Sequence, residues 1–121
     1  MKRLLFLVLA LASFSAFAYI SSVSYTFSPP SAKVVDLSSG NLFHFPITVT
    51  VSAASGDTAK VEYSTTPGAA QNPGAAIWMP SVNLSSVTAT ERETLPSPIT
   101  AIRFTTISGT GTDTAEIAWG Y

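Results

Sequence analysis

The stretch Pro98–Tyr121, PITAIRFTTISGTGTDTAEIAWGY, sets the fold class of this chain. Apolar and polar residues alternate on both sides of a turn rich in glycine and threonine, residues 108–113. Successive side chains of a β-strand point to opposite faces, so this alternation predicts two strands with one buried face each. We expect the strands to cover residues 99–107 and 114–119 and to pair with each other as a hairpin.

The two faces of this hairpin differ in their chemistry. With the turn centred between Thr110 and Gly111, one face is predicted to be buried. Its side chains are Ile102, Phe104, Ile117 and Trp119. The other face places Arg103 diagonally opposite Glu116, within reach of an ion pair. We therefore interpret Arg103 as a surface charge with a structural partner, and such an exposed pair contributes under about 1 kcal/mol.

The same alternation continues upstream of this stretch. Residues 43–51 (FHFPITVTV) form the clearest strand, with apolar side chains on one face and polar ones on the other. Residues 59–63 alternate again after a loop. We expect Val49 to pair with Val61, and Ile47 with Tyr63, because this register places both apolar faces on one side.

Shorter strands are predicted elsewhere in the chain, at residues 23–27, 34–37 and 88–95. Residues 82–87 are only weakly patterned. Apolar residues show no helical spacing after residue 20, and glycine and proline punctuate the chain. The predicted fold is a single antiparallel β-sandwich of about seven or eight short strands, jelly-roll or immunoglobulin-like.

Residues 1–18 have the form of a helical secretory signal peptide. Two basic residues precede the apolar run LLFLVLAL, and residues 16–18 have the small-x-small form of a signal-peptidase site. We expect cleavage between Ala18 and Tyr19, which leaves residues 19–121 as one domain. The alternative is an uncleaved anchor, although a spanning helix needs roughly 20 apolar residues.

Composition excludes several classes of partner. Without the predicted signal peptide, four basic residues remain against seven acidic ones, a net charge of −3 with His44 neutral. Nucleic acids and anionic membranes attract clusters of Lys and Arg, so we expect neither as a partner of the cleaved domain. The 121-residue chain has no cysteine, which removes disulfides, Cys-ligated zinc and thiol catalysis.

Residues suited to catalysis are sparse. His44, the single histidine, is interpreted as a surface residue, because a general base needs an oriented neighbour. Glu91 and Glu93 share one strand face like paired catalytic acids, but Arg92 lies between them, and a solvated face is favoured. The sequence has no calcium-loop motif and no histidine pair. We predict no enzyme activity, no metal and no cofactor.

A loop at residues 67–76 (PGAAQNPGAA) precedes a candidate ligand-binding residue. Long loops often carry function. Trp78 follows this loop, and its flat indole suits stacking on a sugar ring, with Tyr63 as a second aromatic. A position in the core is favoured for Trp78, because Ile77 and Met79 flank it and one of those faces must be buried. Trp78 and Tyr63 are the candidate site if the protein binds a glycan.

Residues 61–121 resemble a pattern found in small bacteriophage virion proteins. The matching pieces are Tyr63-Ser64, Trp78, ITAIR at 99–103, the turn at 108–112 and the last strand at 116–119. The resemblance implies a β-sandwich on the surface of a capsid, tail or fibre. The predicted signal peptide departs from this pattern, since most tail and capsid proteins assemble in the cytoplasm; it suits assembly through the inner membrane or a cell-surface protein of the same fold.

The alternation in Asp113–Tyr121 is similar to the end of chaperone–usher pilins. This resemblance implies a C-terminal strand that a chaperone recognises by strand addition. The disulfide that is usual in pilins is absent here.

Together these features predict a structural or adhesive protein that is exported and then secreted, periplasmic or attached to a virion or bacterial surface. Its predicted partners are other protein subunits, either copies of itself or components of that surface. The alternatives are a secreted carbohydrate-binding module that uses Trp78 and Tyr63, with a glycan as partner, and a pilin-like fibre subunit.

Overall fold

The computed structural model describes residues 20–38, 46–95 and 98–120, and within these ranges the chain is built from strands and loops. The strands are β1 (Ile20–Phe27), β2 (Lys33–Asp36), β3 (Ile47–Ser52), β4 (Thr58–Ser64), β5 (Met79–Pro80), β6 (Thr90–Leu95), β7 (Ala101–Ser108) and β8 (Asp113–Gly120). The described part contains no helix of the length and apolar character needed to cross a bilayer. The all-β class and the predicted number of strands are confirmed.

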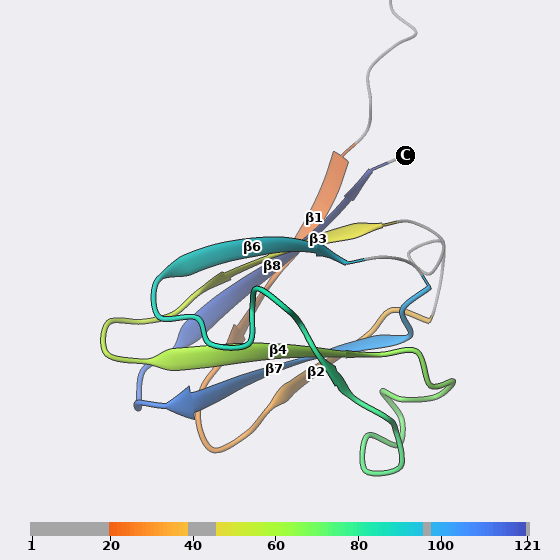
Figure 1. The fold of residues 1–121 in the computed structure, drawn as a ribbon, viewed down its shortest axis with the longest axis horizontal. Coiled ribbons are helices and arrows are strands. Elements are labelled where there is room, and N and C mark those ends of the chain that lie inside the picture. Colours follow the sequence, from red (N-terminus) through yellow and green to blue (C-terminus); the bar gives the residue numbers. More distant parts are fainter. Residues whose placement is uncertain (1–19, 39–45, 96–97, 121) are drawn as a thin grey trace, which may run out of the picture.

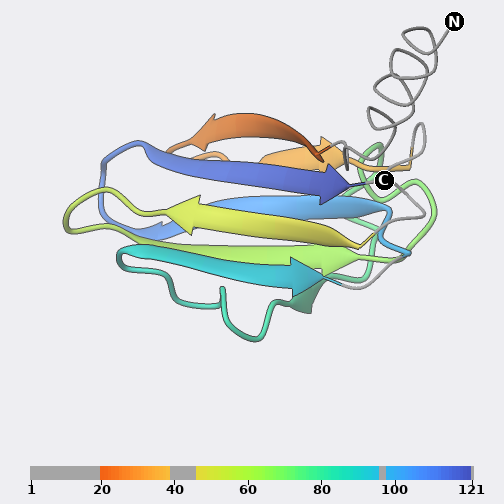
Figure 2. The ribbon, with the colours of Figure 1, turned by 90° about the horizontal axis from the view of Figure 1, so that it is seen from above.

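The eight strands form two antiparallel sheets that pack face to face (Figures 1 and 2). Sheet A has the order β1-β8-β3-β6, and sheet B has the order β2-β7-β4-β5. The first strand pairs with the last, the second with the last but one, and so on inward to the β4–β5 connection. This rolled-up arrangement is that of a jelly roll, which decides between the two predicted sandwich types.

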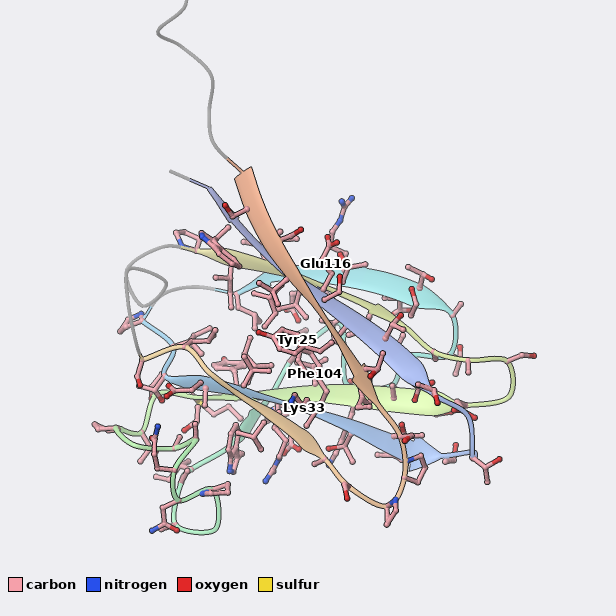
Figure 3. The ribbon with its side chains drawn as sticks, turned by 180° about the vertical axis from the view of Figure 1, so that it is seen from behind. Tyr25, Lys33, Phe104 and Glu116 are labelled. Carbon is pink, nitrogen blue, oxygen red and sulfur yellow. The ribbon has the colours of Figure 1, made fainter. Side chains whose placement is uncertain are left out.

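The core lies between the two sheets and is formed by the inward side chains of most strands together with buried residues of the loops. Its largest fully buried side chains are Phe104, Leu37, Ile47, Leu84, Leu95, Ile102, Ile117, Val49, Val51, Val61 and Val87. Phe104 stacks on Phe27 at a centroid distance of 5.6 Å and on Tyr25 at 6.4 Å. Figure 3 shows Tyr25 and Phe104 together in the middle of the sandwich. These contacts join the edge strand β1 to the centre of sheet B.

The predicted pairing of residues 47–51 with residues 59–63 is wrong. Val49 lies opposite Ile117 and Glu93 in sheet A, whereas Val61 lies opposite Phe104 in sheet B. Both valines are fully buried, so alternation identified their inward faces correctly. It could not identify their lateral neighbours, because the loop after β3 carries the chain across the core to the other sheet.

The hairpin predicted for the last two strands is also wrong. β7 belongs to sheet B and β8 to sheet A, so they face each other across the core. The prediction that Ile102, Phe104 and Ile117 are buried is confirmed, and Trp119 is partly buried against the same core. β8 pairs with β1 on one side and with β3 on the other. The strand that the pilin resemblance singled out is therefore central rather than free at an edge.

Candidate functional site

Arg103 lies on the outer face of sheet B, where it is bound on two sides. Its Nε and Nη2 atoms donate hydrogen bonds to the two carboxylate oxygens of Glu62, at 3.2 and 3.0 Å. Lys60 Nζ lies 3.3 Å from Glu62 Oε1. The predicted partner Glu116 is wrong, because Glu116 lies in sheet A and the sandwich separates the two residues. The interpretation of Arg103 as a surface charge with a structural partner holds, with Glu62 as the partner.

The charge of Glu62 is stabilised by these neighbours. Partial burial by itself would raise the pKa of Glu62, since burial disfavours a carboxylate. The hydrogen bonds and positive charge of Arg103, together with those of Lys60, outweigh this effect and lower the pKa of Glu62 below its usual 4.5. Glu62 is therefore ionised at neutral pH and holds the two cations on this face.

Trp78 covers the Arg103 side of this cluster. Its ring centroid lies 4.4 Å from Arg103 Cζ, which is the geometry of a cation–π contact. Its indole Nε1 donates a hydrogen bond of 2.9 Å to the carbonyl oxygen of Pro73, in the loop that precedes it. The indole is half-buried by these contacts, so Trp78 is neither a core residue nor a freely exposed platform.

The structure does not bring Trp78 and Tyr63 together on one surface. Tyr63 shares the inner side of β4 with Val61 and packs against the core. Trp78 lies over Arg103, on the outer side of the same sheet. Two aromatic rings on opposite faces of a sheet cannot stack on one sugar, so the candidate glycan site is divided.

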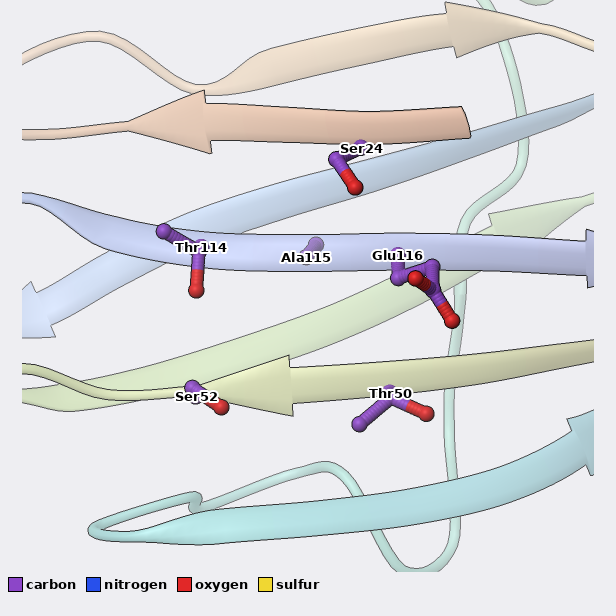
Figure 4. A pocket seen from close by; sticks show the side chains of 6 residues that line it. All are labelled: Ser24, Thr50, Ser52, Thr114, Ala115 and Glu116. Atoms are coloured by element: carbon purple, nitrogen blue, oxygen red, sulfur yellow. The ribbon is translucent and has the colours of Figure 1, made fainter. Parts of the chain in front are cut away.

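The outer face of sheet A has a shallow depression of about 250 Å³ (Figure 4). It is lined by Ser24, Thr50, Ser52, Thr114, Ala115 and Glu116. Hydroxyl groups continue from there toward β6, where the Thr48 and Thr94 hydroxyls lie 3.2 Å apart and those of Ser52 and Thr90 lie 2.9 Å apart. The face is thus rich in hydrogen-bonding groups, with one carboxylate in the depression.

The paired acids Glu91 and Glu93 have separate surroundings. Glu93 accepts hydrogen bonds from the Ser81 hydroxyl and, at 3.4 Å, from the Asn83 backbone, so it holds the segment that follows β5. Glu91 is exposed. Within the described residues no three His, Asp or Glu side chains gather to hold a metal ion. His44 and the Ala18–Tyr19 cleavage site lie outside the described ranges.

Two aspartates that the sequence did not single out are buried at one end of the sandwich. Asp113, at the start of β8, accepts hydrogen bonds from the Ala54 backbone at 2.7 Å and the Thr106 hydroxyl at 2.5 Å. Asp57 accepts one from the Gly111 backbone at 3.3 Å. Buried carboxylates are normally hydrogen-bonded in this way, whereas Asp57 Oδ2 is buried without a hydrogen-bond partner among the described residues. The two residues fasten the β3–β4 and β7–β8 loops together, which is a structural role.

Three of the four sheet edges carry features that oppose pairing with another strand. β6 bears Glu91, Arg92 and Glu93. β5 has two residues including Pro80, and beyond it the segment 81–87 bonds to β4 through Leu84 and Val87 carbonyls at 2.8 Å. The four-residue β2 bears charges at both ends, on Lys33 and Asp36. Charge, proline, short length and coverage are the usual protections of an edge.

The fourth edge, β1, carries none of these protections. Its eight residues, ISSVSYTF, include no charge and no proline. Among the described strands it pairs with β8 alone, so its other side presents backbone N–H and C=O groups. Its inward side chains become more exposed toward its start, from Phe27 at 4% to Val23 at 43%. Among the edges of the described sheets, β1 is the one best suited to strand addition.

No protein-family model and no curated protein matches the sequence. Among solved structures, a chain of the Bacillus endospore appendages, described as a novel family of disulfide-linked pili, aligns over 86% of this chain and 87% of its own with a TM-score of 0.50 and 11% identity. The SPBc2 prophage-derived protein YomS aligns over 88% of this chain and 98% of its own with a TM-score of 0.48 and 15% identity. At such identities the first likeness shows a shared fold alone.

Proposed function

We propose that this protein is an exported structural or adhesive subunit of a virion or bacterial surface, and that it acts by binding other protein subunits. The observation that carries the proposal is the unprotected β1 edge on a sandwich whose other edges are protected. An open edge strand is a template for another chain, and soluble proteins usually block it. An unprotected β1 edge is expected in a protein whose function is to pair with another subunit.

The fold supports this proposal in a general way. Jelly rolls are common in viral capsids and also occur in lectins. One similar structure belongs to an appendage described as disulfide-linked pili. This chain has no cysteine, so it would have to assemble without disulfide links between its subunits. Its export remains a prediction from residues 1–18.

A carbohydrate-binding module is the rival in another class. The division of Trp78 from Tyr63 by the sheet removes its predicted platform. The pilin-like alternative keeps the idea of strand addition, but the free strand is β1 rather than the C-terminal β8.

The proposal is tested by the assembly state of the purified full chain. Light scattering after size-exclusion chromatography, over a hundredfold range of concentration, should show oligomers that grow with concentration, and electron microscopy should show whether they are closed or extended. A glycan array run on the same sample tests the rival. A protein that stays monomeric throughout and binds a glycan would overturn the proposal.

A further inference from the structure

We infer that two copies of this chain pair antiparallel through their β1 strands and join their β1-β8-β3-β6 sheets into one continuous sheet. This inference rests on the proposed assembly function and names its first contact. The partner is identified by the chemistry of the edges described above.

A second copy offers four edges, and its own β1 is the one without an obstacle. Pairing with β6 would set an uncharged strand against Glu91, Arg92 and Glu93, whose charges would lose water. The two-residue β5 and the four-residue β2 are too short to match the eight residues of β1. Two β1 strands match in length and carry no charged side chain of their own. Lys33 of β2 lies over the Tyr25 ring of the same copy, with its Nζ 5.8 Å from the ring centroid.

The alternation of β1 restricts the register. Directly opposite residues of antiparallel strands point to the same face, so an inward residue must oppose an inward one. In the register with the twofold axis at Ser24, Val23 of each copy lies opposite Tyr25 of the other. Ser22 then lies opposite Thr26. Both pairs are favourable across antiparallel strands: Val23 with Tyr25 joins a β-branched side chain to an aromatic one, and Ser22 with Thr26 joins two hydroxyl groups.

The proposed pairing would cover an apolar side chain of β1 that is exposed in the single chain. Phe27 is buried against Phe104 at 5.6 Å, and Tyr25 is half-buried beside it, but Val23 is 43% exposed although it points inward. The sheet thus presents an apolar inner side chain at its open edge. A second β1 would cover Val23 with an aromatic ring and satisfy the outer backbone groups of the strand. The contact is the same patch on both copies, so it closes as a dimer.

The absence of cysteine allows a direct test by cross-linking. In a Ser24→Cys variant of the full chain, the two new thiols would face each other at the axis, with Cβ atoms about 4.5–5.5 Å apart. Mild oxidation should give a covalent dimer in most of the protein. The matched control is Ser22→Cys, on the same exposed face. Its two thiols would lie four residues apart, about 14 Å along the strands, too far to bridge.

A charge placed at the axis gives an independent test. Ser24 lies opposite Glu116 within one copy, so Ser24→Lys should leave the fold intact. Between two copies it sets lysine against lysine and should weaken the dimer roughly tenfold or more, measured by sedimentation equilibrium. Thr94→Lys puts the same charge on the edge strand β6 and should leave the dissociation constant unchanged.

The outcomes separate this inference from the proposed function. Cross-linking at residue 24 with loss of the dimer in Ser24→Lys supports both. Oligomers that survive Ser24→Lys and do not cross-link at residue 24 overturn the β1 pairing and leave an assembly through another surface. A chain that is monomeric at every concentration overturns the β1 pairing, and it overturns the proposed function as well if the same chain binds a glycan.

Discussion

The sandwich contains two polar clusters that differ in burial. At one end Asp113 is fully buried and accepts hydrogen bonds from the Ala54 backbone and the Thr106 hydroxyl. On the outer face of sheet B, Arg103 is bound to Glu62 with its side chain 26% exposed. When the hydrogen bonds of a buried side chain are broken, the polar groups that lose their partner stay unsatisfied, and this lowers the free energy of unfolding. When those of an exposed side chain are broken, water takes the place of the lost partner. The buried cluster around Asp113 should therefore stabilise the fold more than the exposed pair of Arg103 and Glu62.

The largest loss of stability is expected for Asp113→Ala, which tests the comparison most directly. The substitution leaves the part-buried Ala54 N–H and Thr106 hydroxyl without their buried acceptor, so the free energy of unfolding should fall by about 3 kcal/mol. Urea denaturation followed by tryptophan fluorescence measures it. Thr114→Ala, at the exposed neighbouring position, should change the value by no more than about 0.5 kcal/mol. Equal losses in the two variants would contradict the role of burial.

Gly109→Ala tests the same end of the molecule by steric means. Gly109 has a φ of +98°, and a Cβ there would lie 2.0 Å from Asp57 Oδ1. Strain and overlap together should cost about 2 kcal/mol. Gly56→Ala shares the positive φ, +86°, but its Cβ would meet nothing within 4 Å, so it should cost only about 1 kcal/mol. If Gly56→Ala costs as much as Gly109→Ala, close packing on Asp57 contributes nothing.

On the exposed side of the comparison, Arg103→Met removes the Glu62 pair and the contact with Trp78. The loss should be about 1 kcal/mol, because the pair is partly solvated. Lys60→Met removes only a single contact of 3.3 Å to the same carboxylate and should cost less. Thermal unfolding in low salt and in 0.5 M salt measures the stability of both variants. Because salt screens the ion pairs, the stability difference between each variant and the native chain should be smaller in 0.5 M salt. An effect as large as that of Asp113→Ala would reverse the ranking.

The smallest expected effect is the pH dependence that Glu62 confers. Its folded pKa is lower than its unfolded one, so its contribution to stability is fully present above about pH 4.5 and is lost as the pH falls through the folded value. Glu62→Gln should therefore be less stable than the native chain at pH 7, and this difference should shrink as the pH is lowered from 7 through 4.5 to below the folded pKa of Glu62. A stability difference that does not change between these pH values would show that the charge of Glu62 is not involved.

The sequence was sufficient to predict which side chains face the core. Ile102, Phe104 and Ile117 are buried as the alternation indicated, and Val49 and Val61 likewise. Alternation reports the direction of a side chain relative to its own strand. It carries no information on which strand lies alongside, so both predicted hairpins were wrong. In a jelly roll most successive strands lie in different sheets, and nearness in the sequence then misleads.

The candidate surfaces were harder to predict for the same reason. Arg103 was correctly placed outside but was given a partner in the wrong sheet, because Glu62 is its neighbour only through the β4–β7 pairing. Trp78 and Tyr63 were predicted to form one platform. The face of the sheet on which each ring lies depends on the path of the loop between them, and the sequence does not show that path. The openness of β1 could have been suspected from its lack of charge, but its position at an edge required the topology.

The pairing of β1 with β8 also determines when the fold can be completed. Ile20 lies beside Gly120, so the ladder joins residues that are a hundred positions apart in the chain. β8 follows every other described strand, yet it is the one that holds β1 and β3 in the same sheet. Contacts between such distant residues form slowly and only after β8 has left the ribosome. Until then sheet A is unfinished, and β1 has no strand to pair with in its own chain.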